Sequence, residues 1–442
     1  MKRSLLAGCR ALWLVSLAAA SLPGQQPARS ARLDGSWTFW RRQPDGSDFP
    51  LRVTIQTQRD SVTVTGVNGL MLQGHATALG AAFAGKAADR KTDIAAVIRW
   101  SGDSLVGHGT HGVDSIPVLW FAREHVRPAS APTRQTVHPT EFHRIVSTMP
   151  RPLAHVWSGD TIHTETVDAG GIDSSGKRRS GGGNPLTGPF YIENSLPGDV
   201  LAIHLLRVRT NRSWAESGSD IAFGAVDPSY VTGYKEADDS SVKWTIDAAA
   251  GVARVKTPSA KLKNYSVPLR PMLGCLAVAP GFLGRAEVRS TGVPARFGGN
   301  MDYNRLGEGT TVYLGVLQPG AYFYLGDGHA AQGDGELTGD ALETSMDVEF
   351  SVELIRNKRI GYPRAEDASF LMASGIGGSL DQAFRLATTM LAGWLEQDYK
   401  LSRSEVAIVM GTGVQYDIGE VVDGDVHVVA RLPKRLVNAI TP

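Results

Sequence analysis

The segment Gly326-Asp327-Gly328-His329-Ala330-Ala331-Gln332-Gly333-Asp334-Gly335-Glu336 brings glycine, carboxylate, imidazole and carboxamide groups together within a 442-residue chain. Glycine covers little core and loses much entropy on ordering, so this composition indicates backbone shapes that side chains would block. Apolar, strand-like runs flank the segment at 311–316 and 346–352. We therefore predict a loop held between two strands, a typical setting for a metal or acid/base site. The structural alternative is a solvated turn whose aspartates bond their own backbone.

The composition is that of a globular protein, with 42% hydrophobic and 20% charged residues. The length predicts two or three domains. Fifty glycines favour a strand-rich fold with many tight turns over a helical bundle. The 45 basic and 44 acidic residues balance, which argues against nucleic acid as a partner. We predict an α+β, mostly β architecture.

The N-terminus predicts export. Residues 1–3 are basic, residues 11–20 form a short apolar core and a polar stretch follows, so residues 1–31 are interpreted as a signal peptide and polar leader. The apolar core is shorter than the roughly 20 residues that span a bilayer. The mature protein is expected to be periplasmic or secreted, with no membrane attachment. Cys9 leaves with the signal, so Cys275 is interpreted as an unpaired, buried small hydrophobe.

Residues 32–126 are predicted to form a small antiparallel β module, because alternating apolar runs recur between Gly, Asp and Asn turns. This spacing suggests an up-and-down barrel or a meander. A linker that contains Pro and Ser is predicted at 127–147, and a catalytic domain at 148–442. Towards the end of that domain, Ser379 is expected to cap one helix and Ser402 to open a second through a capping box.

Five blocks, in order along the second domain, resemble the acetamidase/formamidase family, hydrolases of short linear amides. They are the glycine-rich segment above together with Thr164-Glu165-Thr166-Val167-Asp168, Asn184-Pro185-Leu186-Thr187-Gly188-Pro189, Pro197-Gly198-Asp199-Val200-Leu201 and Gly298-Gly299-Asn300-Met301-Asp302. The resemblance covers roughly residues 140–440. It implies formamide or acetamide as substrates, with ammonia and formate or acetate as products. It also implies a divalent metal, with Zn²⁺ as the first choice and Ca²⁺ as a second ion.

Four residues are predicted to ligate the metal. Asp168 ends a strand beside paired glycines, and Asp302 follows a similar pair. Asp327 and His329 are two residues apart, so in an extended segment they share one side. Oxygen and nitrogen ligands without thiolate suit Zn²⁺ or another borderline divalent ion, and further carboxylates could hold Ca²⁺ nearby.

Two glutamates and two carboxamides complete the predicted site. Glu336 is the predicted general base, because a carboxylate near an activated water can take its proton and deliver it to nitrogen. Glu165 is a second catalytic candidate, although it lies three residues before Asp168 and would point to the opposite face of an ideal strand. Asn184 and Gln332 are expected to bind the small amide substrate. A homo-oligomer is expected.

Two other functions fit the sequence. An exported, Ca²⁺-stabilised β-rich binding protein without catalysis would use the acidic segment structurally. A serine hydrolase would need a nucleophile, and Gly102-Asp103-Ser104-Leu105 imitates the block of one esterase class. That block lies between two strand-like runs, where Gly-Asp is typical of a hairpin turn, and the strand-to-helix context of a nucleophile is missing.

Overall fold

The structure is a computed structural model, and it describes residues 33–42, 48–66, 69–87, 89–128, 131–231, 241–282 and 285–440. The predicted signal peptide and leader, residues 1–31, lie outside the described residues. Within these ranges the chain forms thirty β-strands and four α-helices, which confirms the predicted mostly β architecture. We find no helix in them with the length and apolar character needed to cross a membrane.

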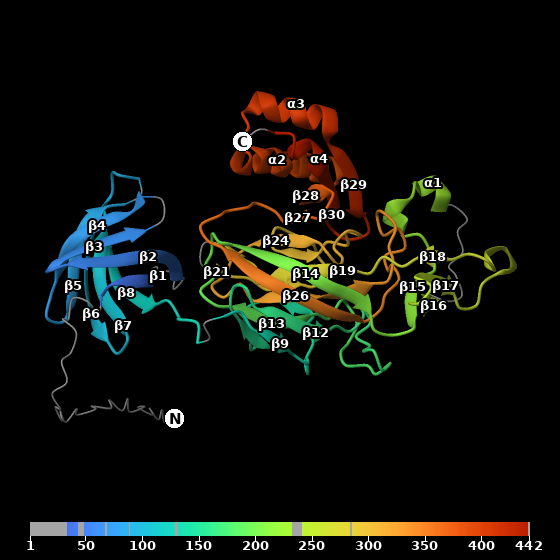
Figure 1. Cartoon of the computed structure of the whole chain (residues 1–442), viewed down its shortest axis with the longest axis horizontal. Helices are drawn as coiled ribbons and strands as arrows, with labels where there is room; N and C mark the ends of the chain where they lie inside the picture. Colours follow the sequence, from blue (N-terminus) through green and yellow to red (C-terminus); the bar gives the residue numbers. More distant parts are fainter. Residues whose placement is uncertain are drawn as a thin grey trace, which may run out of the picture.

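A closed, antiparallel eight-stranded barrel forms one end of the molecule (Figure 1, blue). Its strands are β1 (Gly35–Arg42), β2 (Asp48–Gln58), β3 (Ser61–Gly66), β4 (Met71–Ala76), β5 (Gly80–Lys86), β6 (Asp93–Ser101), β7 (Ser104–His111) and β8 (Asp114–Arg123). Alternate residues point inward, and Trp37, Ile55 and Leu105 are fully buried there. Gly102, at φ 61°, makes the β6–β7 hairpin turn, so the esterase-like block is indeed a turn.

The rest of the chain forms a body in which two sheets enclose the main apolar core. The larger sheet has the order β29 (Gln415–Glu420), β30 (Val426–Pro433), β28 (Phe370–Gly377), β27 (Arg364–Glu366), β24 (Thr311–Gly315), β14 (Val200–Thr210), β26 (Met346–Ile355), β12 (Thr161–Glu165) and β9 (Arg134–Thr136). The smaller sheet has the order β11 (Ala154–Val156), β13 (Thr187–Ile192), β25 (Phe323–His329), β19 (Met272–Val278) and β23 (Gly298–Asn300). Phe350 of the larger sheet contacts Phe190 and Phe323 of the smaller one at ring-centroid distances of 5.2 and 5.4 Å.

Smaller elements extend this body. A four-stranded sheet contains β15 (Trp214–Gly218), β16 (Ser241–Asp247), β17 (Val252–Val255) and β18 (Val267–Pro268). Short pairs join β10 (Ile145–Val146) to β22 (Arg289–Ser290) and β20 (Gly281–Phe282) to β21 (Arg285–Ala286), and α1 (Pro228–Val231) is a single turn. Residues 127–147, predicted as a linker, contribute β9 and β10 to these sheets.

Helices α2 (Leu380–Asp398), α3 (Arg403–Gly413) and α4 (Lys434–Val437) lie together at the top of the view in Figure 1. The hydroxyl of Ser379 accepts the N–H of Gln382, and Ser402 forms the expected capping box with Glu405. Helix α2 packs on β28 at Gly375, where an added Cβ would lie 2.0 Å from the carbonyl oxygen of Ala383.

The predicted loop at residues 326–336 is wrong for its first part, because Phe323–His329 forms the buried strand β25. Its glycines permit close packing here: an added Cβ would lie 2.8 Å from Leu186 Cδ2 at Gly326 and 2.3 Å from Met346 Cγ at Gly328. Such glycine-dependent approach of neighbouring chain segments is a recognised use of glycine within strands. The acidic and imidazole groups therefore stand on a rigid element.

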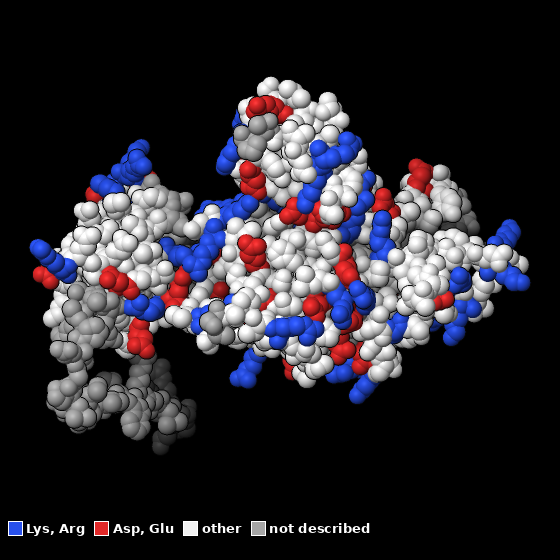
Figure 2. Space-filling view, viewed as in Figure 1, with Lys and Arg blue, Asp and Glu red and all other residues white. Residues whose placement is uncertain are grey.

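The barrel is joined to the body by ionic contacts. Arg52 of β2 donates to both carboxylate oxygens of Asp199 at 3.0 Å and to the carbonyl oxygen of Asn194 at 2.7 Å. Asp199 also accepts the N–H of Leu196, so one carboxylate fixes the turn and the barrel together. Figure 2 shows basic and acidic side chains interspersed over the visible face, in keeping with the balanced charge.

Candidate metal and active site

Two strands and a glycine bring three predicted ligands together. Asp327 and His329 lie on one face of β25, and Asp302 follows β23, on the other side of β19. Gly274 of β19 stands between them: an added Cβ there would lie 2.1 Å from Asp302 Oδ1 and 2.7 Å from Asp327 Oδ2. The missing side chain makes the room in which these carboxylates meet.

The segment after β25 brings two glutamates back to His329. Glu343 forms backbone bridges with both His329 and Glu216 of β15, while Gly335 bridges Glu420 at the end of β29 and so holds Glu336. The nearest carboxylate oxygens lie 2.9 Å (Glu343), 3.6 Å (Asp327), 3.8 Å (Glu336) and 3.9 Å (Asp302) from His329 Nε2. All five residues are buried.

The backbone of the site is unusual. Asp302, Asp327, Glu336 and Asn184 adopt φ values of 40°, 57°, 46° and 53°. Residues with a Cβ rarely occupy this left-handed region, and those that do gather at functional sites, where the surrounding structure holds them. The strain indicates that the positions of these side chains are imposed by the fold.

The ligand atoms fit a divalent cation. Several buried atoms lack a hydrogen-bond partner within the described residues, namely Asp302 Oδ1 and Oδ2, Asp327 Oδ1, His329 Nε2 and Glu343 Oε2. Buried carboxylates persist only if a cation or protons neutralise them. Two overlapping sets, Asp302–Asp327–His329 and His329–Glu336–Glu343, each offer ligand atoms within 4.8 Å of one another. One imidazole with carboxylates and no thiolate suits Zn²⁺ or a similar ion.

Gln332 orients His329. Its Nε2 donates to the carbonyl oxygens of Asp302 at 2.5 Å and Gly419 at 3.1 Å, which places its Oε1 2.8 Å from His329 Nδ1. An oxygen at that position accepts, so Nδ1 carries a proton and Nε2 is the nitrogen that faces the carboxylates and would ligate a cation. The protein thus uses both ends of the carboxamide. Both N–H groups of the carboxamide and one acceptor position of its oxygen are engaged within the protein, and the substrate contact predicted for Gln332 stays a prediction.

Crowding perturbs the protonation of the cluster. Burial raises the pKa of Asp302 well above its ordinary value, and the charges of Glu336 and Asp327 add to this. Burial also raises the pKa of Glu336, and that of Glu343 to about 7. Burial lowers the pKa of His329, but the charges of Glu343 and Asp327 outweigh it and hold that pKa well above its ordinary value. Without a cation the cluster retains protons at neutral pH, and a bound metal would displace them.

A chain of polar groups leads from the cluster towards the surface. Asn184 Nδ2 donates to Asp327 Oδ2 at 3.2 Å and to Asn300 Oδ1 at 2.7 Å, and Asn300 Nδ2 donates to Asp423 Oδ2 at 3.1 Å. Asn184 and Asp423 are half-buried, so the cluster approaches solvent along this edge. Within the described residues, Asn184 Oδ1 has no partner, which leaves it able to accept an N–H from a ligand.

Two predicted site residues do not join the cluster. Asp168 is buried, but its oxygens accept from Arg212 Nη2 at 2.6 Å and from the N–H of Ile172 at 2.8 Å. Because the Arg212 side chain is only 1% exposed, Asp168 neutralises a buried protein cation, and both of its oxygens already accept a hydrogen bond. Glu165 is the last residue of β12; its side chain is 45% exposed, and its Oε1 lies 3.8 Å from His138 Nδ1.

Three residues of the site escape the sequence-based prediction. Glu343 lies in the same acidic region, three residues before β26, and a longer window after Glu336 would have included it. Asn300 lies inside one of the quoted blocks, next to Asp302. Asp423 comes from the turn after β29, beyond both long helices, and no local pattern identifies it.

Residues 283–423 match the model of the acetamidase/formamidase family. The five residues of the cluster, Asp302 to Glu343, all lie within this range. The match confirms the resemblance predicted from the sequence blocks.

Solved structures and a curated protein agree with this match. The chain is similar to an acetamidase from Yersinia enterocolitica, with a TM-score of 0.60 and 26% identity over 71% of this chain and 96% of that one. It is similar to a predicted acetamidase/formamidase from Thermoanaerobacter tengcongensis, with a TM-score of 0.59 and 25% identity over 70% of this chain and 99% of that one. A putative formamidase from Schizosaccharomyces pombe is 25% identical over 213 residues, 39% of this chain. The match spans 52% of that relative, about half its length.

Proposed function

We propose that this protein hydrolyses the C–N bond of short linear amides, formamide or acetamide among them, to ammonia and a carboxylate, with one divalent metal, Zn²⁺ as the first choice. The observation that carries the proposal is the buried set of unpartnered ligand atoms around His329 Nε2, inside the segment that matches the acetamidase/formamidase family. His329, Asp302, Asp327 and Glu343 are the residues that would hold the ion.

An amide carbonyl is a weak electrophile, and its amine is a poor leaving group. A hydrolase must supply an activated water, a group that polarises the carbonyl and a proton donor for nitrogen. A bound divalent metal supplies the first two, because it lowers the pKa of water from about 15.7 to about 7 and polarises the carbonyl oxygen. Gly274 and Gln332 keep the ligands in position for it.

We assign proton transfer to Glu336. Its Oε1 accepts the N–H of Ala341 at 3.1 Å, which fixes the carboxylate beside His329. Burial raises the pKa of Glu336, so its carboxylate is a stronger base than that of an exposed glutamate. Glu336 takes a proton from the attacking water and delivers a proton to the leaving nitrogen.

The surroundings of the cluster favour a small substrate. Its five residues are between 1% and 7% exposed, which suits an amide of a few atoms better than a polymer. At the half-buried edge, Asn184 Oδ1 accepts an N–H of the substrate amide, in keeping with the substrate-binding role predicted for this residue. Export through residues 1–31 and assembly into a homo-oligomer stay predictions.

Ammonia release from formamide and acetamide tests the proposal. Purified full-length protein should release ammonia, lose this activity on treatment with a chelator and regain it when Zn²⁺ is restored. Loss of activity with serine-directed reagents and indifference to the chelator would instead indicate a serine hydrolase. Metal content without any amide hydrolysis would favour a binding protein stabilised by a cation.

A further inference from the structure

The barrel encloses a cavity of about 360 Å³. Trp37 and Trp100 fill the barrel interior at the end away from Arg41, with their ring centroids 5.9 Å apart. Leu33 closes the same end, and its carbonyl oxygen accepts the indole N–H of Trp37. The cavity is more than twice the roughly 150 Å³ of an engineered apolar cavity that takes up benzene. Eight-stranded barrels either fill their interior with side chains or hold one small ligand.

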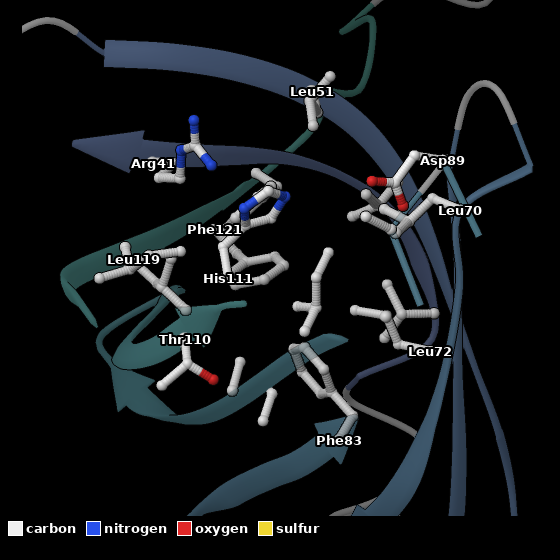
Figure 3. Close-up of a pocket in the computed structure, with 18 of the residues that line it drawn as sticks. Arg41, Leu51, Leu70, Leu72, Phe83, Asp89, Thr110, His111, Leu119 and Phe121 are labelled. Atoms are coloured by element: carbon white, nitrogen blue, oxygen red, sulfur yellow. The ribbon is translucent and has the colours of Figure 1, made fainter. Parts of the chain in front are cut away.

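The sequence explains why this barrel is not filled. Phe83, Ala96 and Gly109 lie side by side across β5, β6 and β7, and Gly85 lies in the next row, beside Ile94. Of these residues, Ala96 lines the cavity, and its short side chain leaves space that a larger one would fill. At Gly85 and Gly109 an added Cβ would lie 2.5 Å from the carbonyl oxygen of Met71 and 2.3 Å from that of Ala95, so these glycines permit close approach of the strands. The remaining lining is largely apolar and includes Leu72, Phe83 and Phe121 (Figure 3).

One side of the cavity is cationic. Arg41 of β1 and His111 of β7 line it, and Arg359 reaches it from the body, after β26. Within the described residues, the side chain of neither arginine has a hydrogen-bond or ion-pair partner. Asp89 is the one carboxylate in the lining, but its oxygens accept from Thr92 and Lys91. Figure 3 shows Arg41, His111 and Asp89 along one side and Phe83 on the other.

We propose that the barrel binds a small apolar carboxylate. The apolar body of the ligand occupies the cavity, and its carboxylate pairs with Arg41 and Arg359. Guanidinium groups beside an apolar cavity favour an anion over a neutral ligand of the same size, because the anion supplies the missing partner. Since Arg359 belongs to the body, the ligand contacts both parts of the molecule. This site is separate from the metal cluster, so the proposal does not depend on amide hydrolysis.

Calorimetric titration of the full chain with octanoate and with 1-octanol tests the proposal. Octanoate should bind at least about tenfold more tightly than octanol, because a charge-assisted contact contributes on this scale. The double variant Arg41→Gln/Arg359→Gln should lose that difference and retain octanol binding. Ala96→Phe should fill the cavity and weaken both ligands.

Arg99→Gln, on the outer face of β6, is the matched control and should bind octanoate like the wild-type protein. Octanoate that shows no saturable binding would overturn the site itself. Equal affinities for octanoate and octanol, or octanoate binding unchanged in the double arginine variant, would overturn the assignment of the ligand as an anion. Arg41 is half-buried and Arg359 is exposed, so replacing them removes no part of the core. The arginine variants therefore test the proposal even if the cavity-filling variant does not fold.

Discussion

The carboxamide oxygen of Gln332 lies 2.8 Å from His329 Nδ1, and the Gln332 Nε2 is held by the carbonyl oxygens of Asp302 and Gly419. Three segments that are distant in sequence therefore set the orientation of one imidazole. Partners of this kind fix the tautomer of a ligating histidine and contribute strongly to metal affinity.

Gln332→Leu should lower the affinity for Zn²⁺ by roughly 10- to 100-fold, because His329 loses the acceptor that fixes its proton on Nδ1. Competition with a chromophoric chelator measures this. Gln415→Leu, at an exposed position of β29, is the control and should leave the affinity unchanged. Wild-type affinity in Gln332→Leu would show that His329 needs no such partner.

Glu343→Gln and Glu165→Gln make the same chemical change at two places. Glu343 Oε1 lies 2.9 Å from His329 Nε2, whereas Glu165 is 45% exposed beside His138. We expect Glu343→Gln to reduce both metal content and amide hydrolysis by at least about tenfold, a scale typical of a lost charged contact, and Glu165→Gln to keep both. The reverse result would return Glu165 to the site.

Gly274→Ala should disrupt the cluster, because its Cβ would lie 2.1 Å from Asp302 Oδ1. The carboxylates must then move apart, so metal uptake should fall sharply in a protein that still folds. Gly393→Ala is the matched control: this helical glycine has no atoms near an added Cβ, and alanine there should stabilise by about 0.5–1 kcal/mol. Metal content per folded molecule, measured alongside thermal unfolding, separates the two effects.

The candidate metal site was predictable from the sequence where its residues lie close together in the chain. Asp327, His329 and Glu336 lie in one eleven-residue window, and Asp302 repeats its glycine-carboxylate pattern. Asp168 shows the limit of such patterns. A carboxylate at a strand end beside glycines can pair with a metal or with a protein cation, and only the fold reveals that Arg212, 44 residues away, reaches it. Similarly, glycines at 326 and 328 indicate tight backbone approach, but not whether that occurs in a loop or in a buried strand.

Asp168→Asn should destabilise the protein without emptying the metal site. The change leaves Arg212 buried without its carboxylate, and breaking a buried pair in this way costs about 3–5 kcal/mol. Denaturant unfolding measures the loss, and metal content per folded molecule should stay at the wild-type value. Asp381→Asn breaks the exposed pair with Arg385 and should cost less than about 1 kcal/mol. Loss of metal from folded Asp168→Asn would instead make this residue a ligand.

The stability of the metal-free protein should fall as pH rises from 6.5 to 8. Burial raises the pKa of Glu343 to about 7 and of Glu420 to about 8, from 4.5 in each case. A group whose pKa is raised in the folded state contributes stability that is fully present below its unfolded-state pKa. This stability is lost as the pH rises through its folded-state pKa. His427 has the opposite effect on the pH dependence of stability, because burial lowers its pKa from 6.5 to about 4. That effect is confined to pH values below 6.5, outside this window.

Thermal unfolding of chelated protein across this window should therefore show a falling Tm. With saturating Zn²⁺ the slope should flatten or reverse, because the cation replaces the protons and binds more tightly as they leave. Glu420→Gln should reduce the slope of the chelated protein, since it removes one titrating group while keeping the shape of the side chain. A Tm that rises with pH in the chelated protein would contradict the protonation assigned to the cluster, and identical slopes with and without Zn²⁺ would contradict its role as the metal site.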